Sequence, residues 1–307
     1  MFGLEIEMCN IKRAKVAEVT KKVLKTESPI EVKHDGEIYR LRDNSGRIWT
    51  VEVDSSIVDE PDYQSELVTP ILTLEDMPML EELVNALKAA GARSSGVDGC
   101  GIHIHLNGYG HTVESIKNFV NIFAAHEDQL FKAFDVDEWR IREYCKRTKR
   151  IFIEMLNTAK PTTIQDLAFI WYDSHRPFAS SRPSRMRRFI SRVANSFCAV
   201  DHRYDASRYH ALNLHAFFTR YHTIELRYGQ WTTETSLDWT VLKSFILIAV
   251  KMDEMARKSE AVNPEMQSTE SFGHWLLRLG LTGNENKDVR TFLLRNYENV
   301  KDRECIA

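Results

Sequence analysis

The sequence predicts an α+β protein built on a mainly antiparallel sheet flanked by helices. Segments with strand character often follow one another directly along the chain, which favours antiparallel pairing. Within these segments apolar and polar residues alternate, as expected for a sheet with one face on the core and the other open. The chain has 307 residues, 43% hydrophobic and 28% charged, which is enough for a large core.

The N-terminal part supplies the first strands. Residues Phe2–Met8 alternate from the start, and Asn10 is a suitable N-cap for a basic helix that ends near Leu24. Two strands, Glu37–Leu41 and Arg47–Val53, are joined by an Asn-Ser-Gly turn. We therefore expect a strand, a helix and a hairpin in this order.

The next segment continues the alternation of strand and helix. A strand over Tyr63–Thr69 stops at a proline, and Thr73 caps a helix that ends before Gly91. A glycine-rich turn over 96–101 leads into the strand Ile102–Asn107. This strand is expected to return to the sheet.

Helices dominate the rest of the chain. Thr112 begins a long helix to about Phe134, and residues 137–200 are predicted to form a helical, strongly basic insert. Two strands, Ala211–Phe217 and Thr223–Tyr228, return to the sheet. The region 236–307 is predicted to be helices that pack on the domain: one capped by Ser236 and ending near Lys258, one over 269–279 and one over 286–303. We expect a single catalytic domain over residues 1–307.

Four strands carry side chains of metal-binding types on one face. Because successive side chains point to opposite faces of a strand, each strand presents apolar residues on one side and polar residues on the other. The polar rows are Glu5 and Glu7, then Glu52 and Asp54, then His103, His105 and Asn107, and finally Thr223, Glu225 and Arg227.

Any one of these rows alone is more typical of a solvated surface, but together they contain no lysine. If the rows converge, their carboxylates repel one another by about 4 kcal/mol per pair at 4 Å with an effective dielectric constant of 20. Such a cluster needs cations. Carboxylate oxygens suit Mg²⁺ and Mn²⁺, and imidazole also suits Mn²⁺. The rows therefore predict a metal-dependent enzyme.

Two further residues bear on this interpretation. Glu66, in the segment before a proline, is another carboxylate of the same kind. Arg227 shares a strand face with Glu225, and an arginine beside a metal carboxylate is suited to hold a phosphate that bridges to the metal. A purely structural pairing of Arg227 with a neighbouring glutamate explains it equally well.

The order of these motifs resembles that of the amidoligase family, a branch of the carboxylate–amine ligases related to glutamine synthetase and glutamate–cysteine ligase. The resemblance covers roughly residues 1–250 and rests on the segments Phe2–Met8, Trp49–Ser55, Glu66–Pro70, Gly101–Asn107, Arg208–Asn213 and Thr223–Arg227. It implies a curved sheet that forms a catalytic funnel like that of glutamine synthetase. Neither a P-loop nor a dinucleotide-binding glycine motif is present in the sequence, so ATP would bind in this funnel.

The resemblance also implies a reaction that needs ATP and Mg²⁺ or Mn²⁺. A substrate carboxylate takes the γ-phosphoryl group to give an acyl phosphate, and an amine then displaces phosphate to leave an amide. The residue roles that the resemblance implies are metal ligation by Glu5, Glu7, Glu66, His103 and Glu225, phosphoryl stabilisation by Arg227, phosphate contacts by Arg208 and Arg220, nucleotide or substrate contacts by His105 and Asn213, and orientation of the amine by Asp54.

Three other functions stay open at this stage. The same scaffold can support an ATP-dependent phosphotransferase, for which a stable phosphorylated product would accumulate in place of an amide. Carboxylates and histidines also build two-metal hydrolases, which act without nucleotide. A binding module with an inactive site is the third.

Composition limits the partners and the compartment. The formal net charge of −3 comes from 41 basic and 44 acidic residues, a balance that argues neither for nor against nucleic acid. Nucleic acid is not an expected partner because stacking aromatic residues are sparse in the basic loop 174–188. Five cysteines without a CxxC pair fit a reducing compartment. With no segment shaped like a signal peptide or a membrane span, we expect a cytoplasmic protein. The acid and the amine, from small molecules to a peptide or protein, and the oligomeric state are not specified.

Two sequence features have alternative interpretations. The loop 174–188 and the stretch Lys146–Arg150 are rich in arginine, which suits bidentate anion contacts, so they either recruit an acidic substrate or form a solvated surface. Cys100 precedes the histidine strand. A small residue in a tight turn explains it better than a nucleophile does.

Overall fold

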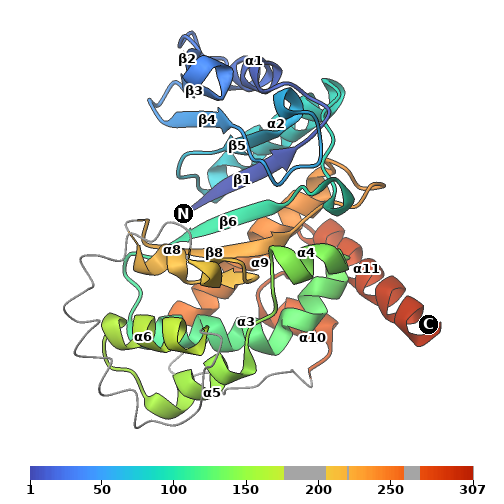
Figure 1. Ribbon diagram of the computed structural model, residues 1–307. Helices are drawn as coiled ribbons and strands as arrows, with labels where there is room; N and C mark the ends of the chain where they lie inside the picture. The colour runs from blue at the N-terminus through green and yellow to red at the C-terminus, as the bar shows by residue number, and fades with distance from the viewer. Residues whose placement is uncertain (176–204, 220, 259–269, 307) are drawn as a thin grey trace.

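The computed structural model describes residues 1–175, 205–219, 221–258 and 270–306, without the side chains of 301–306. Within these residues the strands form one open sheet in the order β2-β3-β4-β5-β1-β6-β8-β7, and every neighbouring pair is antiparallel (Figure 1). The strands are β1 (Phe2–Met8), β2 (Glu31–Lys33), β3 (Ile38–Arg42), β4 (Ile48–Glu52), β5 (Ser65–Val68), β6 (Ile102–Asn107), β7 (Leu212–Asn213) and β8 (Thr223–Gly229).

Helices lie at both ends of the sheet (Figure 1). Their bounds are α1 (Arg13–Leu24), α2 (Met77–Ala89), α3 (Val113–Ala133), α4 (Glu138–Glu143), α5 (Arg150–Ala159), α6 (Ile164–Ser174), α8 (His215–Phe218), α9 (Trp239–Lys258), α10 (Phe272–Arg278) and α11 (Lys287–Ile306). Helix α1 packs on β3, β4 and β5, and α9 packs on β6 and β8. Helix α3 packs on α9, and α5 and α11 pack on α3. Helices and an antiparallel sheet together make a mixed α+β architecture.

The apolar strand faces and the helices share one hydrophobic core. Leu4, Ile6 and Ile104 are buried in it, and so are Val16 of α1 and Phe245 of α9. The alternation in β1 and β6 therefore predicted the core face correctly. Among the described helices, none is both long enough and apolar enough to cross a membrane.

Several local predictions need correction. Asn10 does not cap α1: it has a φ of 60°, a left-handed conformation that asparagine tolerates, and its amide donates to the carbonyl of Gly91. Ser236 does not cap α9, because its hydroxyl accepts from the amide of Ser94. Asp238 instead accepts from the amide of Thr240 at 2.7 Å and caps the helix.

The predicted strand over Ala211–Phe217 is also wrong. Only Leu212–Asn213 pair with β8, and the chain turns into the short helix α8 directly afterwards. The side chain of Asn213 accepts a hydrogen bond from the amide of His215, which favours this turn. The strand β2, which was not predicted, is exposed along its whole length and has no buried face that could produce an alternating pattern.

Tyr228 provides a test of the core. Its ring is fully buried and packs edge-on against Phe134 and Phe245. Its hydroxyl is buried and has no hydrogen-bond partner within the described residues. Because an unsatisfied buried hydroxyl costs about 1–3 kcal/mol, we expect Tyr228→Phe to unfold at a higher urea concentration, with a free energy of unfolding raised by about 1 kcal/mol. A loss of stability would show that the hydroxyl has a partner.

Candidate functional site

Strand register brings the polar rows of the central strands together. Strand β1 lies between β5 and β6, with Glu7 opposite Glu66 on one side and Glu5 opposite His103 on the other. Strand β8 continues the sheet beyond β6 and adds Glu225. The five side chains predicted to bind metal therefore lie on one face, in the middle of the sheet.

These five residues form two groups that share one histidine. Glu5, His103 and Glu225 make the first group, and Glu7, Glu66 and His103 make the second. In each group, one potential ligand atom from every residue lies within 4.8 Å of the others. The two ring nitrogens of His103 face different groups: Nδ1 is 2.8 Å from Glu5 Oε2, and Nε2 is 3.5 Å from Glu7 Oε1.

Burial distinguishes this cluster from a solvated sheet face. Glu7, Glu66, His103 and Glu225 are between 2% and 7% exposed, and the side chain of Glu5 is 26% exposed. The expectation that this face is open to solvent is therefore wrong at the cluster. Charged groups are almost never buried in this way unless they are paired or coordinate a metal.

Glu66 is the least compensated member of the cluster. Within the described residues, no group donates a hydrogen bond to its carboxylate or forms an ion pair with it. Burial, together with the charges of Glu5 and Glu7, raises the pKa of Glu66 well above its ordinary value. A buried carboxylate that repels its neighbours is suited to accept a bound cation.

The other side of the cluster is better compensated. Burial opposes ionisation of Glu5, but His105 and His103 outweigh it and hold the pKa of Glu5 well below its ordinary value. Burial likewise disfavours the charged form of His105, yet Glu5 and Glu225 raise its pKa to about 9. His105 Nε2 lies 3.1 Å from Glu5 Oε1, so this imidazolium is paired with the carboxylate.

Glu225 is held in place from two directions. Arg227, which is 6% exposed, donates from Nη1 to its Oε1, and Asn213 donates from Nδ2 to its Oε2 at 2.6 Å. Burial opposes the charge of Glu225, but Arg227 and His105 lower its pKa overall. The amide of Asn213 thus orients a carboxylate of the cluster, and the predicted contact of Asn213 with nucleotide or substrate stays a prediction.

Asp54 borders the second group. It follows β4, is half-buried, and accepts from the amide of Ser56 at 2.8 Å. Its charge contributes to the raised pKa of Glu7 and of Glu66 after the larger effect of burial. Asp54 therefore lies within electrostatic reach of the cluster, at the edge where a positively charged group would be attracted.

The two predicted phosphate contacts are placed less fully. Arg208 is half-buried in a short 3-10 helix, and its guanidinium lies 5.6 Å from the ring centre of Tyr209. Arg220 lies outside the described residues, so its predicted role is untested.

The structure adds two residues that sequence reasoning missed. The amide of Gly101 donates to Glu7 Oε2 at 2.5 Å. Arg140 of α4 is 1% exposed, and its charge favours ionisation of Glu7 against the larger effect of burial. A glycine directly before the histidine strand could have suggested close packing, whereas no sequence signal separates Arg140 from Arg142 in the same basic segment.

Two arginines of the stretch Lys146–Arg150 form ion pairs with acidic residues of the chain. Arg147 pairs with Asp128 and lies 4.7 Å from the ring centre of Phe131, and Arg150 pairs with Glu154. These contacts account for both arginines without an acidic substrate. The rest of the basic loop, 176–188, lies outside the described residues.

Cys100 has the surroundings of a structural cysteine. It is fully buried, and its contact with Cys9 and its burial both raise the pKa of its thiol. A thiol in this state is a poor nucleophile, which agrees with the interpretation of a small residue in a tight turn.

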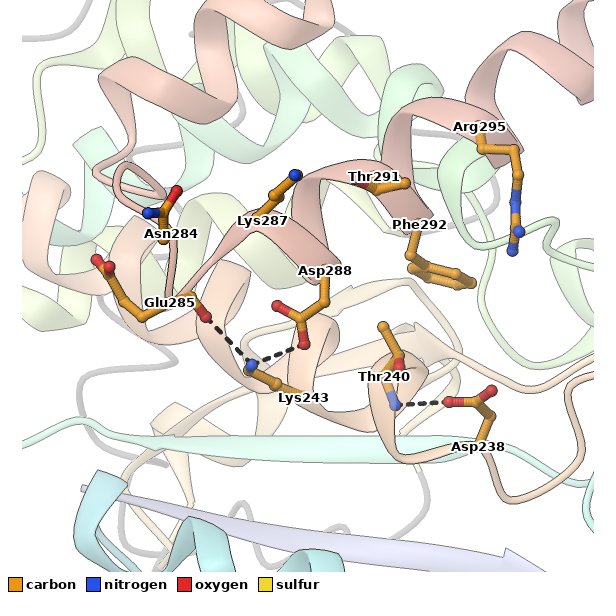
Figure 2. A pocket seen from close by; sticks show the side chains of 10 residues that line it. All are labelled: Asp238, Thr240, Lys243, Asn284, Glu285, Lys287, Asp288, Thr291, Phe292 and Arg295. Atoms are coloured by element: carbon orange, nitrogen blue, oxygen red, sulfur yellow. Dashed lines mark hydrogen bonds and ion pairs between the residues drawn. The ribbon is translucent and has the colours of Figure 1, made fainter.

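Figure 2 shows a hollow of about 660 Å³ on another part of the molecule. It lies between the start of α9 and the N-terminal half of α11, and its side chains carry both signs of charge. Lys243 on its wall is bound to Asp288 and to the carbonyl of Glu285 (Figure 2). The hollow contains no histidine and none of the five cluster residues, and we therefore place the candidate site at the cluster.

Comparison with known proteins identifies one family. A family model described as "Putative amidoligase enzyme" matches residues 1–242, which include every member of the cluster. No curated protein and no solved structure matches the chain.

Proposed function

The chain belongs to the amidoligase family, and from this premise we propose that it is a carboxylate–amine ligase that depends on ATP and on Mg²⁺ or Mn²⁺. The product would be an amide, formed through an acyl phosphate. The observation that carries the proposal is that four glutamates form two largely buried groups that share His103. Membership of this family supports ligation in general, and the dependence on ATP and metal is our extension of it.

The donor set fits a hard divalent cation. Four carboxylates and one imidazole are available, and Glu66 is buried without a compensating group among the described residues. Mg²⁺ and Mn²⁺ take carboxylate oxygens, and Mn²⁺ also accepts imidazole. Because a neutral imidazole offers a single lone pair, His103 would join Glu7 and Glu66 at one ion, and Glu5 and Glu225 would hold a second. Bound ions would neutralise charge on the ATP phosphates.

The first half-reaction would depend on Arg227. The substrate carboxylate oxygen would attack the γ-phosphorus, and the bond from phosphorus to the bridging oxygen would break to release ADP. Arg227 is buried and always charged, and it already contacts Glu225, so its remaining donors could stabilise charge on the transferring group. Arg208 and Arg220 are proposed as further phosphate contacts, and His105 and Asn213 as contacts for nucleotide or substrate.

The second half-reaction would use Asp54. The cationic amine would lose one proton to free its lone pair, its nitrogen would attack the acyl carbon, phosphate would leave, and the nitrogen would lose a second proton to give the amide. Asp54 is half-buried at the edge of the cluster, which suits it to orient the cationic amine and accept the first proton. The acid and amine could be small molecules or groups on a peptide or protein.

The proposal predicts a metal-dependent gain in stability. A ligand at one hundred times its Kd stabilises a protein by about 2.7 kcal/mol, and each kcal/mol raises Tm by roughly 2–4 °C. Thermal unfolding with Mn²⁺ and a non-hydrolysable ATP analogue should therefore shift upward by several degrees. Glu66→Gln and Glu225→Gln should lose the shift, and Glu66→Gln should be at least as stable as wild type without metal because it removes repulsion.

Glu127→Gln is the matched control. Glu127 is also a buried glutamate, 6% exposed, but it accepts hydrogen bonds from Thr148 and belongs to neither group. This variant should keep the full shift. A shift with metal alone, to which nucleotide adds nothing, would favour a metal-dependent hydrolase. No shift in wild type would favour a binding module with an inactive site.

A further inference from the structure

Arg140 is a fully buried arginine beneath the cluster. Its Nη1 donates to the carbonyl of Gly229 at 3.0 Å and to Gln230 Oε1 at 3.4 Å, and its Nη2 donates to the carbonyl of Arg227 at 3.3 Å. Its Nε is buried and has no hydrogen-bond partner within the described residues. The guanidinium therefore fastens α4 to the end of strand β8.

The same guanidinium packs directly against Gly101, the residue before β6. A Cβ atom added to Gly101 would lie 2.0 Å from Nη2 and 2.7 Å from Cζ of Arg140. Only glycine permits this contact. Arg140 thus holds the strand end whose amide donates to Glu7 Oε2 at 2.5 Å.

The hydrogen bond from Gly101 decides how Glu7 is presented. With Oε2 engaged, Oε1 is the oxygen near His103, 3.5 Å from its Nε2. Groups that orient a metal ligand in this way commonly change metal affinity 10–100-fold when they are mutated. Arg140 acts one step further out, through the position of Gly101.

We infer that Arg140 is a positioning residue that sets the divalent-cation affinity of the Glu7–Glu66–His103 group. The inference deepens the proposed function and rests on it, because it concerns the same metal-binding cluster. The effect is expected mainly on this group, because Arg140 packs against Gly101, which holds Glu7, whereas its contacts with β8 go to backbone carbonyls and not to the side chain of Glu225.

Charge and position make opposite predictions, and this allows a sharp test. The positive charge of Arg140 opposes binding of a cation nearby, so a purely electrostatic role predicts tighter binding in Arg140→Met and unchanged binding in Arg140→Lys. A positioning role predicts weaker binding in Arg140→Lys, which keeps the charge but loses the planar fork that spans Gly229 and Arg227.

The experiment is a titration with Mn²⁺ alone, followed by the electron paramagnetic resonance signal of free Mn²⁺. Wild type is expected to bind two ions. Arg140→Lys is expected to bind one of them about tenfold more weakly and the other as wild type does. Gly101→Ala disturbs the contact between Gly101 and Arg140 from the other side and should give the same result. Circular dichroism establishes the folded fraction at the temperature used.

Arg13→Lys is the matched control. Arg13 is 8% exposed and also donates to three backbone carbonyls, those of Gly36, Pro61 and Gln64. It belongs to α1, and its three carbonyl partners lie in the segments that precede β3 and β5 and not against Gly101, so its replacement should cost stability without changing Mn²⁺ affinity. This comparison separates a positioning role from general loss of a buried arginine.

Each outcome decides the inference. Weaker binding of one ion in Arg140→Lys and Gly101→Ala, with Arg13→Lys unchanged, supports it. Unchanged binding in both test variants, or an equal loss in Arg13→Lys, overturns it and leaves the proposed function standing. A wild-type protein that binds no Mn²⁺ overturns both. If either test variant fails to fold, the milder Gln230→Leu should weaken one ion at least threefold, and no loss overturns the inference.

Discussion

Replacing Arg227 by methionine is expected to lower the free energy of unfolding by about 3–5 kcal/mol in the absence of metal. Arg227 is 6% exposed and is the direct cationic partner of Glu225. Its charge also favours ionisation of Glu7, where burial has the larger and opposite effect. Removing it leaves the buried Glu225 without its arginine partner, and breaking a buried ion pair from one side is far more costly than removing both partners.

A double variant isolates the ion pair from simple loss of packing. Arg227→Met combined with Glu225→Gln removes both charges and leaves an amide oxygen that can still accept from Asn213. We expect the double variant to regain most of the lost stability. Urea unfolding in a chelator, with midpoint and slope compared across the four proteins, measures the coupling. A cost below about 1 kcal/mol for Arg227→Met alone would contradict the central place of this charge.

The same pair explains why Arg227→Lys is a useful companion. Lysine keeps a positive charge near Glu225 but lacks the planar set of donors that can contact a carboxylate and a phosphoryl group together. We expect this variant to retain most of its stability. A stable protein that still binds Mn²⁺ but no longer supports turnover would separate the structural and the proposed catalytic roles of Arg227.

The side-chain face of each site residue could be predicted from the sequence, but the pairing could not. A period of two shows that Glu5 and Glu7 share a face, and it does so for His103 and His105. It does not show that Glu5 stands opposite His103, because register depends on contacts between segments about one hundred residues apart. From the sequence alone, convergence of the polar rows is an assumption. The strand order and register of the structure bring the rows of β1, β6 and β8 side by side.

Burial of the cluster could not be predicted from the alternation of apolar and polar residues. Local alternation cannot distinguish a polar face in water from one covered by other parts of the chain. Arg140 illustrates the point, because it packs against Gly101 beside the cluster from α4, whose sequence looks like an ordinary charged segment. The caps failed for a related reason: Asn10 and Ser236 have cap-forming side chains, but tertiary partners use them elsewhere.

A second large effect is expected on acidification, from two histidines near the end of α6, the buried His210 and the half-buried His175. The rings of His175 and His210 are 4.4 Å apart, and that of His175 lies 4.0 Å from Trp171. Nδ1 of His175 is 2.6 Å from the carbonyl of Trp171, and Nδ1 of His210 is 3.0 Å from the carbonyl of Ser207. These contacts suit neutral rings that donate from Nδ1.

Burial lowers both pKa values, with a further contribution from neighbouring charges. The pKa of His175 falls to about 3 through burial, His210 and Lys149, although the carbonyl of Trp171 and Asp205 oppose this. The pKa of His210 falls to about 4 through burial and the charges of Lys149 and Lys146, against the carbonyl of Ser207. In the unfolded chain both would titrate near pH 6.5.

The folded protein therefore binds fewer protons than the unfolded chain between about pH 6.5 and pH 4. Above pH 6.5 both histidines are neutral in the folded and the unfolded protein, so they do not lower the free energy of unfolding. As the pH falls toward their pKa values in the folded protein, the free energy of unfolding decreases by up to about 1.4 kcal/mol per pH unit for each histidine. Between pH 7 and pH 5 the two together should cost about 4 kcal/mol. The carboxylates titrate in the same range, so wild type alone cannot assign this loss.

Variants assign it. In His175→Gln/His210→Gln, the difference in unfolding free energy between pH 7 and pH 5, measured with urea, should shrink by about 4 kcal/mol relative to wild type, whatever the double substitution costs at pH 7. Replacement of the exposed His34 by glutamine should leave the difference unchanged. An equal loss in wild type and the double variant would mean that water reaches these rings and that they titrate in the folded protein as they do in the unfolded chain.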